Sequence, residues 1–236
     1  MTVFIIRRLI QSIFLILIMS VIVFFSIYAI GNPVDVLVPP DATQAEKDHV
    51  VIQFGLDRPI WEQYGRFLLN AVKGDMGKSF RYNEPALKLI IERAPATLEL
   101  AFSALLITIV IGIPLGILAG YRPNALSSKF IMAGSIFGFS VPTFWLGLML
   151  IMVFAVILGW LPAGGRGQTV DLFGIPVSFL TVDGLKHLIL PALNLAAFKC
   201  SLILRLTRAG VREAVLTDYV KYARAKGISG SRIVLV

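Results

Sequence analysis

The sequence has 236 residues, of which 57% are hydrophobic and 15% are charged, and its mean hydropathy is +0.82. These values exclude an ordinary water-soluble domain and predict a membrane protein. One cysteine excludes an intramolecular disulfide, and two histidines far apart in the sequence give no metal-binding spacing, so we expect neither a metal nor a cofactor. The formal net charge of +8 would suggest nucleic acid in a soluble protein. In a membrane protein, excess Lys and Arg mark the cytoplasmic face instead, so no nucleic acid is expected.

Four apolar segments predict four membrane-spanning helices. A helix rises 1.5 Å per residue and needs about 20 residues to cross a hydrocarbon core of about 30 Å. The first segment is uncharged and longer than the apolar part of a signal peptide, which favours a retained helix over a cleaved leader. The predicted spans are residues 12–30, 97–120, 130–158 and 187–206.

The distribution of positive charge predicts the orientation of these spans. Arg7 and Arg8 precede the first span, and Arg122 and Lys129 lie between the second and the third. The chain from Lys199 onward carries eight basic and two acidic residues. Because basic residues collect on the cytoplasmic side, the amino terminus is predicted to be cytoplasmic.

Residues 31–96 would then lie outside and form a small helical region. Thr43 and Glu46 have the spacing of a capping box, and Pro59 can open a second helix with one apolar face. Two or three short helices are expected there. The pattern leaves open whether they pack on one another or lie on the membrane surface.

Small residues predict close helix packing in the second span. Gly112, Gly116 and Gly120 repeat every four residues and form a stripe that another helix can approach closely. Pro114 removes one backbone hydrogen bond and predicts a kink. Ordinary packing and a moving hinge both fit this pattern.

The third and fourth spans each contain a candidate pathway residue. The third span is about 43 Å long as a helix, and it has an obvious break at Pro142. An interrupted helix often lines a substrate path, although a simple kink is the alternative. Lys199 is a charge inside the fourth span, where it either extends to the inner surface or faces a water-filled pathway.

The chain ends in a basic stretch that predicts a short cytoplasmic helix over residues 218–227. Thr217 and Asp218 can cap it, and Gly227 can end it. A helix of about ten residues is unstable alone in water and needs a partner surface. Anionic lipid would explain the basic residues, whereas the small face of Val220, Ala223 and Gly227 favours a groove on another protein.

Several motifs, in order along nearly the whole chain, resemble the membrane subunits of bacterial ABC importers for peptides and nickel, and most closely the dipeptide and oligopeptide permease branch. They are GLDRP with the following QY, GDMGKS, ATLEL, WLP and DYVKYARAKG. The last motif resembles the EAA loop, whose short helix docks in a cleft of the ATP-hydrolysing subunit. The resemblance implies an ATPase-coupling role for Asp218, Tyr219, Val220, Ala223, Arg224, Ala225, Lys226 and Gly227, with the loop pattern itself falling on Lys221, Tyr222, Ala223 and Gly227.

The resemblance also implies the assembly and its mechanism. The expected partners are a second permease subunit, two ATP-binding subunits, an extracytoplasmic solute-binding protein that delivers peptides or a related small solute, and membrane lipid. The permease is not itself an enzyme, and the sequence contains no P-loop. Closure of the ATPases would pull on residues 218–227 and change access to the pathway in the bacterial inner membrane.

We therefore expect an all-α, polytopic membrane protein with four parts. These are a cytoplasmic end with the first span (1–30), an extracytoplasmic helical region (31–96), a transmembrane core (97–206) and a cytoplasmic coupling segment (207–236). Family members continue with further helices, so the chain is expected to be truncated at its carboxyl end. A non-transporting receptor or scaffold and an inactive truncated remnant are the alternatives. A secondary transporter is disfavoured because Glu99 is the only acidic residue within a predicted span.

Overall fold

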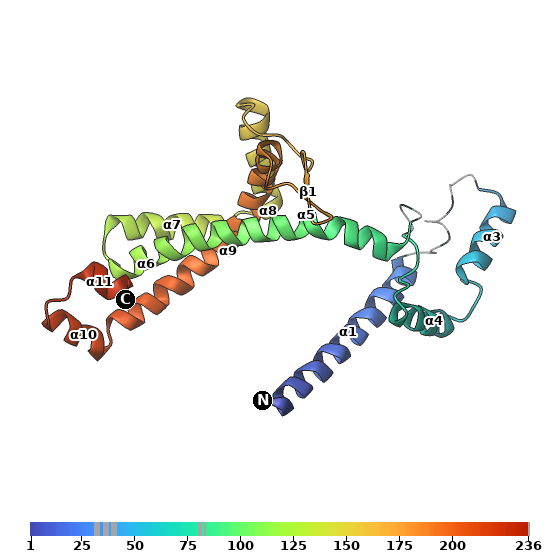
Figure 1. Ribbon diagram of the computed structural model, residues 1–236, viewed down its shortest axis with the longest axis horizontal. Helices are drawn as coiled ribbons and strands as arrows, with labels where there is room; N and C mark the ends of the chain where they lie inside the picture. The colour runs from blue at the N-terminus through green and yellow to red at the C-terminus, as the bar shows by residue number, and fades with distance from the viewer. Residues whose placement is uncertain (31–33, 35–37, 39–41, 80–81, 83, 236) are drawn as a thin grey trace. The chain divides into compact units, whose positions relative to one another are not determined.

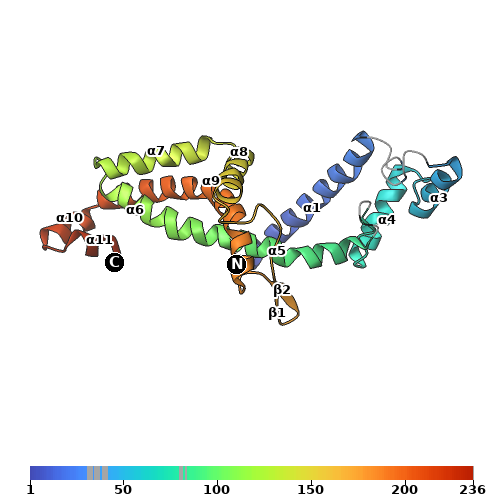
Figure 2. The same ribbon diagram turned by 90° about the horizontal axis from the view of Figure 1, so that it is seen from above.

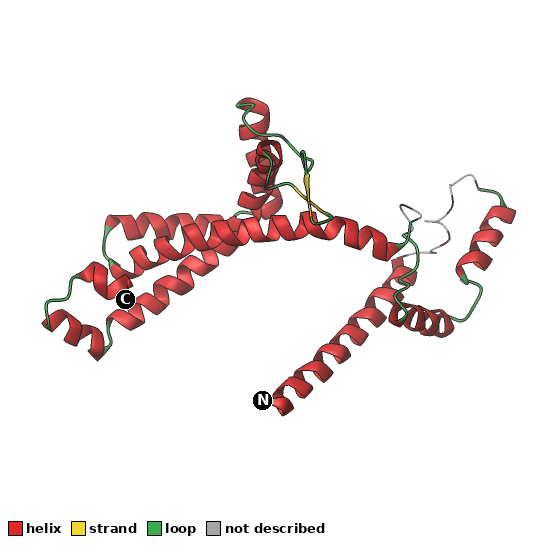
Figure 3. Ribbon diagram, in the orientation of Figure 1, coloured by secondary structure: helices red, strands yellow, loops and turns green. Residues whose placement is uncertain are grey.

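A computed structural model describes residues 1–30, 34, 38, 42–79, 82 and 84–235. The fold is mostly helical, which confirms the predicted class, and the described residues add one small antiparallel hairpin that the sequence did not predict. Its strands, β1 (Val170–Leu172) and β2 (Ile175–Val177), are the yellow segments of Figure 3. The chain divides into two compact units, Met1–Glu92 and Arg93–Val236, each with its own packing.

The described helices include three that are long and apolar enough to cross a membrane, with a bent pair as a fourth candidate. The three are the spans Thr2–Ser26, Ala86–Tyr121 and Val182–Val215. Each of these helices extends beyond its predicted apolar segment. The predicted boundary at residue 97 falls inside a helix that begins at Ala86, because hydropathy marks only the apolar part of a helix and not its amphipathic extension.

The first unit contains α1 (Thr2–Ile30), α3 (Gln44–Phe54) and α4 (Ile60–Val72). The capping box is formed, since the Thr43 hydroxyl accepts from the Glu46 amide at 3.4 Å and the Glu46 carboxylate accepts from the Thr43 amide at 2.8 Å. The Ser20 and Tyr64 hydroxyls lie 2.8 Å apart, and the rings of Phe24 and Tyr64 meet edge to face at 5.3 Å. The apolar face of α4 therefore packs on the end of α1.

The second unit is built around α9 (Val182–Val215), the orange helix of Figures 1 and 2. The helices α6 (Ile113–Tyr121), α7 (Leu126–Ser140) and α8 (Thr143–Leu150) pack on it. Many of the buried side chains in this unit are small, and they include Ala104, Ala119, Ala192, Ala196, Ser135 and Ser201. Small side chains allow the close backbone approach by which helices associate in a membrane.

The second span contains a π-helical turn just before Pro114, where the sequence predicted a kink. The chain runs from α5 (Ala86–Ile107) through a π-helical segment, Thr108–Gly112, into α6 as one span of 36 residues. Proline cannot donate a hydrogen bond to the carbonyl four residues earlier, and its ring crowds that carbonyl. A π-helical turn immediately before proline widens the helix and makes room for the ring without ending the helix. The irregularity therefore lies about one turn before the residue that was expected to cause it.

A sharp break separates α7 from α8. Val141 has an extended backbone (φ −76°, ψ 127°), the conformation favoured by a residue that precedes proline, and Pro142 then opens α8. The two helical parts of this span, Leu126–Ser140 and Thr143–Ile157, are bent by 104° relative to each other, and the second ends in a π-helical segment, Ile151–Ile157. The break lies where the sequence predicted it.

Candidate functional site

The carboxyl-terminal part of the chain folds back as two short helices. The helix α10 (Asp218–Ala225) follows the end of α9, and α11 (Gly230–Leu235) follows α10. Thr217 has the extended backbone of an N-cap residue, but its hydroxyl donates to the Ala214 carbonyl at 2.5 Å and makes no cap hydrogen bond. The predicted side-chain cap by Thr217 is therefore wrong, because the end of α9 offers a nearer acceptor.

The helix α10 has one face turned toward its own chain and one turned outward. Val220 is only 4% exposed, whereas Tyr219 and Tyr222 are 68% and 63% exposed. The Lys226 ammonium lies 4.6 Å from the centre of the Tyr222 ring, on the same side. We call Tyr219, Tyr222 and Lys226 the tyrosine face.

This arrangement changes which residues are available to a partner. The sequence favoured the small face of Val220, Ala223 and Gly227 as the one that enters a groove. Val220 is buried within the chain and Ala223 is half-buried. Helical periodicity defines such faces, but it does not say which one the preceding helix covers. Other residues with a predicted ATPase-coupling role are exposed, namely Asp218, Arg224, Ala225 and Lys226.

Gly227 ends α10 for a backbone reason. Its φ is +75°, in the left-handed region that favours glycine, and a Cβ added there would meet nothing within 4 Å. A tighter contact follows at Gly230, where a Cβ would lie 2.0 Å from the hydroxyl oxygen of Tyr121. The segment after α10 is thus seated closely on the end of α6.

The glycine stripe of the second span lies against α9. A Cβ on Gly116 would lie 2.7 Å from the Thr207 Cβ, and one on Gly120 would lie 2.8 Å from the Val211 Cβ. Gly112 is less crowded, with the Cys200 sulfur at 3.3 Å. Contacts below 3.0 Å leave no room for a side chain, so these positions set how closely α6 and α9 approach.

The broken span, α7 and α8, packs on another side of α9. A Cβ on Gly138 would lie 2.8 Å from the Ser201 hydroxyl, and one on Gly147 would lie 3.2 Å from the Asn194 amide nitrogen. The Ser135 hydroxyl donates to the Ser201 carbonyl at 3.1 Å. Pro142 is exposed and lies between these two contacts in the chain. The break is therefore held on both sides by the same helix.

Lys199 lies on the face of α9 that is turned away from these contacts. It is exposed, together with Leu195, Leu202 and Leu206, which share its side of the helix. Within the described part of the chain Lys199 forms no ion pair. The result is one positive charge on an otherwise apolar, uncovered face.

The arginines toward the carboxyl end of α9 are partly packed and do not form a fully solvated stripe. The Arg205 guanidinium lies 4.4 Å from the centre of the Phe139 ring and donates to the Ser201 carbonyl at 3.3 Å. The Arg208 Nε is buried with no hydrogen-bond partner among the described residues. Arg212 is exposed. A stacked guanidinium links α7 to α9 near the break.

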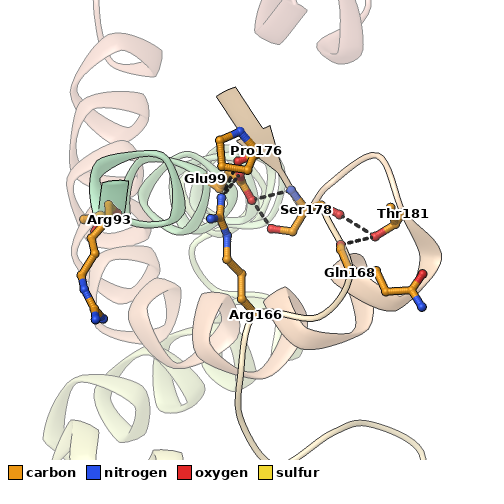
Figure 4. A network of polar contacts seen from close by, with 8 residues as sticks. Arg93, Glu99, Arg166, Gln168, Pro176, Ser178 and Thr181 are labelled. Atoms are coloured by element: carbon orange, nitrogen blue, oxygen red, sulfur yellow. Dashed lines mark hydrogen bonds and ion pairs between the residues drawn. The ribbon is translucent and has the colours of Figure 1, made fainter. Parts of the chain in front are cut away.

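An ion pair between half-buried Arg166 and buried Glu99 holds the hairpin loop against α5, as Figure 4 shows. Glu99 is 8% exposed, and its carboxylate accepts from an Arg166 Nη2 at 3.0 Å and from the Ser178 amide at 3.0 Å. The Ser178 hydroxyl also donates to it, and the same Arg166 nitrogen donates to the Pro176 carbonyl at 2.5 Å. Three hydrogen-bond donors thus converge on one buried carboxylate and fix the loop to α5.

Sequence reasoning missed this network. Glu99 was considered only as a candidate for ion coupling, and Arg166 lies in a loop 67 residues away. The available signal was one acidic residue in an apolar span, which calls for a partner of opposite charge. No spacing rule identifies a partner so distant in the chain.

The same loop is held a second time at the start of α9. The Thr181 hydroxyl accepts from the Gly184 amide as an N-cap and also lies 2.7 Å from the Gln168 carbonyl. The Gln168 amide donates to the Asp183 carboxylate at 2.8 Å. The hairpin is thus fastened to α5 on one side and to α9 on the other.

Comparison with known families identifies the type of protein. Residues 112–236 match the model of the binding-protein-dependent transport system inner membrane component. Residues 1–101 match that of the N-terminal part of such membrane components. The chain belongs to this family of transporter permeases. The permease is therefore a multi-pass inner membrane component.

Curated relatives extend the match over nearly the whole permease. It is 36% identical over 235 residues to the oligopeptide transport system permease protein AppB of Bacillus subtilis, covering 99% of this chain and 72% of the relative. It is 34% identical to the dipeptide transport system permease protein DppB of Alkalihalophilus pseudofirmus, covering 97% and 72%. It is 38% identical to the probable D,D-dipeptide transport system permease protein DdpB of Escherichia coli, covering 87% and 64%.

Family membership confirms the predicted type of protein. The permease is the membrane part of an ABC transporter and is not an enzyme, since ATP hydrolysis belongs to separate subunits. Its family also implies ATPase subunits and a solute-binding protein as partners. The roles of individual residues are a separate question.

Proposed function

We propose that this permease translocates peptides across the inner membrane and that α10 couples this movement to ATPase subunits through its tyrosine face. The observation that carries the proposal is the division of α10 into an anchored and an exposed side. Val220 is buried against the chain, while Tyr219 and Tyr222 are exposed. Tyrosine is enriched at protein interfaces relative to the rest of the surface.

The coupling path runs from α10 into the membrane. The short helix α10 follows α9 directly, and the tight contact of Gly230 with Tyr121 joins the same segment to α6. A force on the tyrosine face would therefore act on α6 and α9 together. Since both helices are closely packed along the glycine stripe, they would move as one body.

The proposed assembly has a second permease subunit, two ATP-binding subunits and an extracytoplasmic solute-binding protein, with the amino terminus and α10 in the cytoplasm. Excess positive charge after Lys199 supports this orientation. The names of the relatives, which are peptide, dipeptide and oligopeptide permeases, support peptides as the solute. Membrane lipid surrounds the spans.

We place the pathway on the face of α9 that carries Lys199. A charge on a face covered only by lipid costs about 2.5–3.5 kcal/mol, so contact with a water-filled path or with the second permease is more favourable. Pro142 lies on the other flank of α9, and its break leaves backbone groups that lipid cannot satisfy, so we propose it as a separate candidate for lining a path. Snorkelling of Lys199 to the inner surface is the alternative, and labelling of a Lys199→Cys variant in the presence and absence of peptide distinguishes them.

Copurification with the cognate ATPase subunits tests the coupling role. The double variant Tyr219→Asp with Tyr222→Asp should lose most of the ATPase that copurifies with wild type, because it places two charges in the proposed contact. Lys129→Asp is the control, since Lys129 is an exposed residue of α7 that lies outside the predicted coupling residues and also receives a negative charge.

Two results would contradict the proposal. One is an ATPase yield in the double variant equal to that of wild type, and the other is an equal loss in the Lys129→Asp control. A receptor or scaffold would bring down no ATPase in any variant. A secondary transporter is opposed by Glu99, whose carboxylate is held by Arg166 and Ser178 and is not free to bind an ion.

A further inference from the structure

The first unit contains a cavity of about 650 Å³ that the proposed function does not use. Its walls are the last turns of α1, one side of α4 and two loops, residues 55–58 and 75–78. The helix α4 lies beside the end of α1 (Figure 1), where Ser20 and Tyr64 are hydrogen-bonded. Both loops belong to motifs that carry the family resemblance, GLDRP and GDMGKS, so these motifs build one shared surface.

One side of the cavity is apolar and belongs to the membrane-spanning helix. Val23 and Phe24 line it from α1, and Phe67 lines it from α4. The rings of Phe24 and Phe67 lie 5.8 Å apart. Val23 and Phe24 lie within the candidate span Thr2–Ser26, so this side is at the level of the hydrocarbon edge.

The rest of the lining includes charges of both signs. Arg58 and Arg66 both line the cavity, and both bind the Glu62 carboxylate, at 2.5 Å and 3.3 Å. The hydrogen bond from Arg58 holds the pKa of Glu62 below its ordinary value, so the carboxylate stays charged at neutral pH. The two arginines are therefore fixed in place around one anion.

Three charged lining residues form no salt bridge among the described residues, namely Asp57, Asp75 and Lys78. The Asp75 carboxylate accepts from the Gly77 amide at 2.9 Å, which fixes it in its own loop. Asp57 and Lys78 are exposed. They are the anion and the cation best placed to meet a ligand.

We infer that this cavity binds a phospholipid whose headgroup carries a phosphate and a primary ammonium, as in phosphatidylethanolamine. Lys78 and the two arginines would hold the phosphate, Asp57 would hold the ammonium, and the acyl chains would lie along Val23 and Phe24. A volume of 650 Å³ falls within the range of about 300–1,000 Å³ typical of small-molecule sites. A free peptide has the same two charges, but it would not require an apolar wall that continues into the bilayer.

Native mass spectrometry of the full chain in detergent tests this inference. Delipidated protein is titrated with phosphatidylethanolamine, phosphatidylcholine and phosphatidylglycerol of identical acyl chains. We expect phosphatidylethanolamine to bind most tightly. Lys78→Gln should weaken all three lipids about fivefold, since it removes a contact to the shared phosphate. Asp57→Asn should weaken phosphatidylethanolamine alone, to the level of the other two.

Lys73→Gln is the matched control, because Lys73 is an exposed lysine after α4 that does not line the cavity. It should leave all three affinities unchanged. Equal binding of the three lipids, or equal weakening by Lys73→Gln and Lys78→Gln, would overturn the inference. Displacement of the lipid by a dipeptide that competes for Lys78 would also overturn it and would assign the cavity to the transported solute.

Discussion

Replacing Gly116 with Ala tests the packing of α6 against α9 most directly. The added Cβ would lie 2.7 Å from the Thr207 Cβ and 2.8 Å from the Leu204 carbonyl oxygen. Carbon atoms normally approach to about 3.5–4.0 Å, so the shortfall is about 1 Å. Since the carbonyl is backbone and cannot rotate away, α9 itself has to shift.

The expected cost follows from this shift. Overpacking by one methyl group costs about 1–3 kcal/mol, and the better helix propensity of Ala returns about 0.5–1 kcal/mol. The difference is about 0–2.5 kcal/mol, and because one of the short contacts is to backbone we expect a net destabilisation of about 1–2 kcal/mol. Gly134→Ala is the control with the opposite sign, because a Cβ at Gly134 in α7 would meet nothing within 4 Å and gains only the propensity.

The single cysteine provides the assay. Cys200 is half-buried on α9 and faces Gly112, so its reaction with a maleimide reports on opening of the same interface. A loss of 1–2 kcal/mol in interface stability should raise the labelling rate about 5–30-fold in Gly116→Ala, with a lower thermal midpoint. Equal labelling in Gly116→Ala and Gly134→Ala would refute the reasoning.

Three further predictions concern the loop, the outer region and the end of α10. Glu99→Gln breaks the buried pair with Arg166 at a cost of about 3 kcal/mol, and hydrogen exchange in β1 and β2 should rise; unchanged exchange would contradict the anchoring role. The hydrogen bond from the Thr43 amide lowers the pKa of Glu46 below its ordinary value of 4.5. The capping box should therefore stabilise α3 fully above pH 4.5, and amide protection in α3 should fall as the pH drops through the pKa of Glu46 in the folded chain. Protection that does not change down to strongly acidic pH would exclude a stabilising capping box. Gly227→Ala forces a side chain to φ +75° at about 1–2 kcal/mol and should loosen α10 and α11 in hydrogen exchange, whereas Gly227→Asn should be tolerated better. Equal exchange in the two variants would be inconsistent with a left-handed helix stop.

Local patterns predicted much of the fold. The apolar segments located the helices that can cross a membrane, the T-x-x-E spacing located the start of α3, and the dipeptide Val141-Pro142 located the break in the third span. Each of these features depends on residues within one or two turns of each other. The extent of the helices was less predictable, because an amphipathic extension such as the start of α5 has no hydropathy signal.

The candidate site was less predictable because its contacts join distant residues. The sequence indicated a glycine stripe but not that Thr207 and Val211 would cover it, and it indicated a short basic helix but not that Val220 would turn inward. The outward turn of Tyr219 and Tyr222 depends on how the chain reverses after α9.

By itself, the sequence determined that this chain is a helical membrane protein of the permease family, because hydropathy and motif order are properties of residues near one another in the chain. Only the tertiary structure decided which faces are covered, that Glu99 meets Arg166 across 67 residues, and that the GLDRP and GDMGKS loops line one cavity. The physical reason is that burial and charge pairing depend on distances in space, which sequence separation does not give.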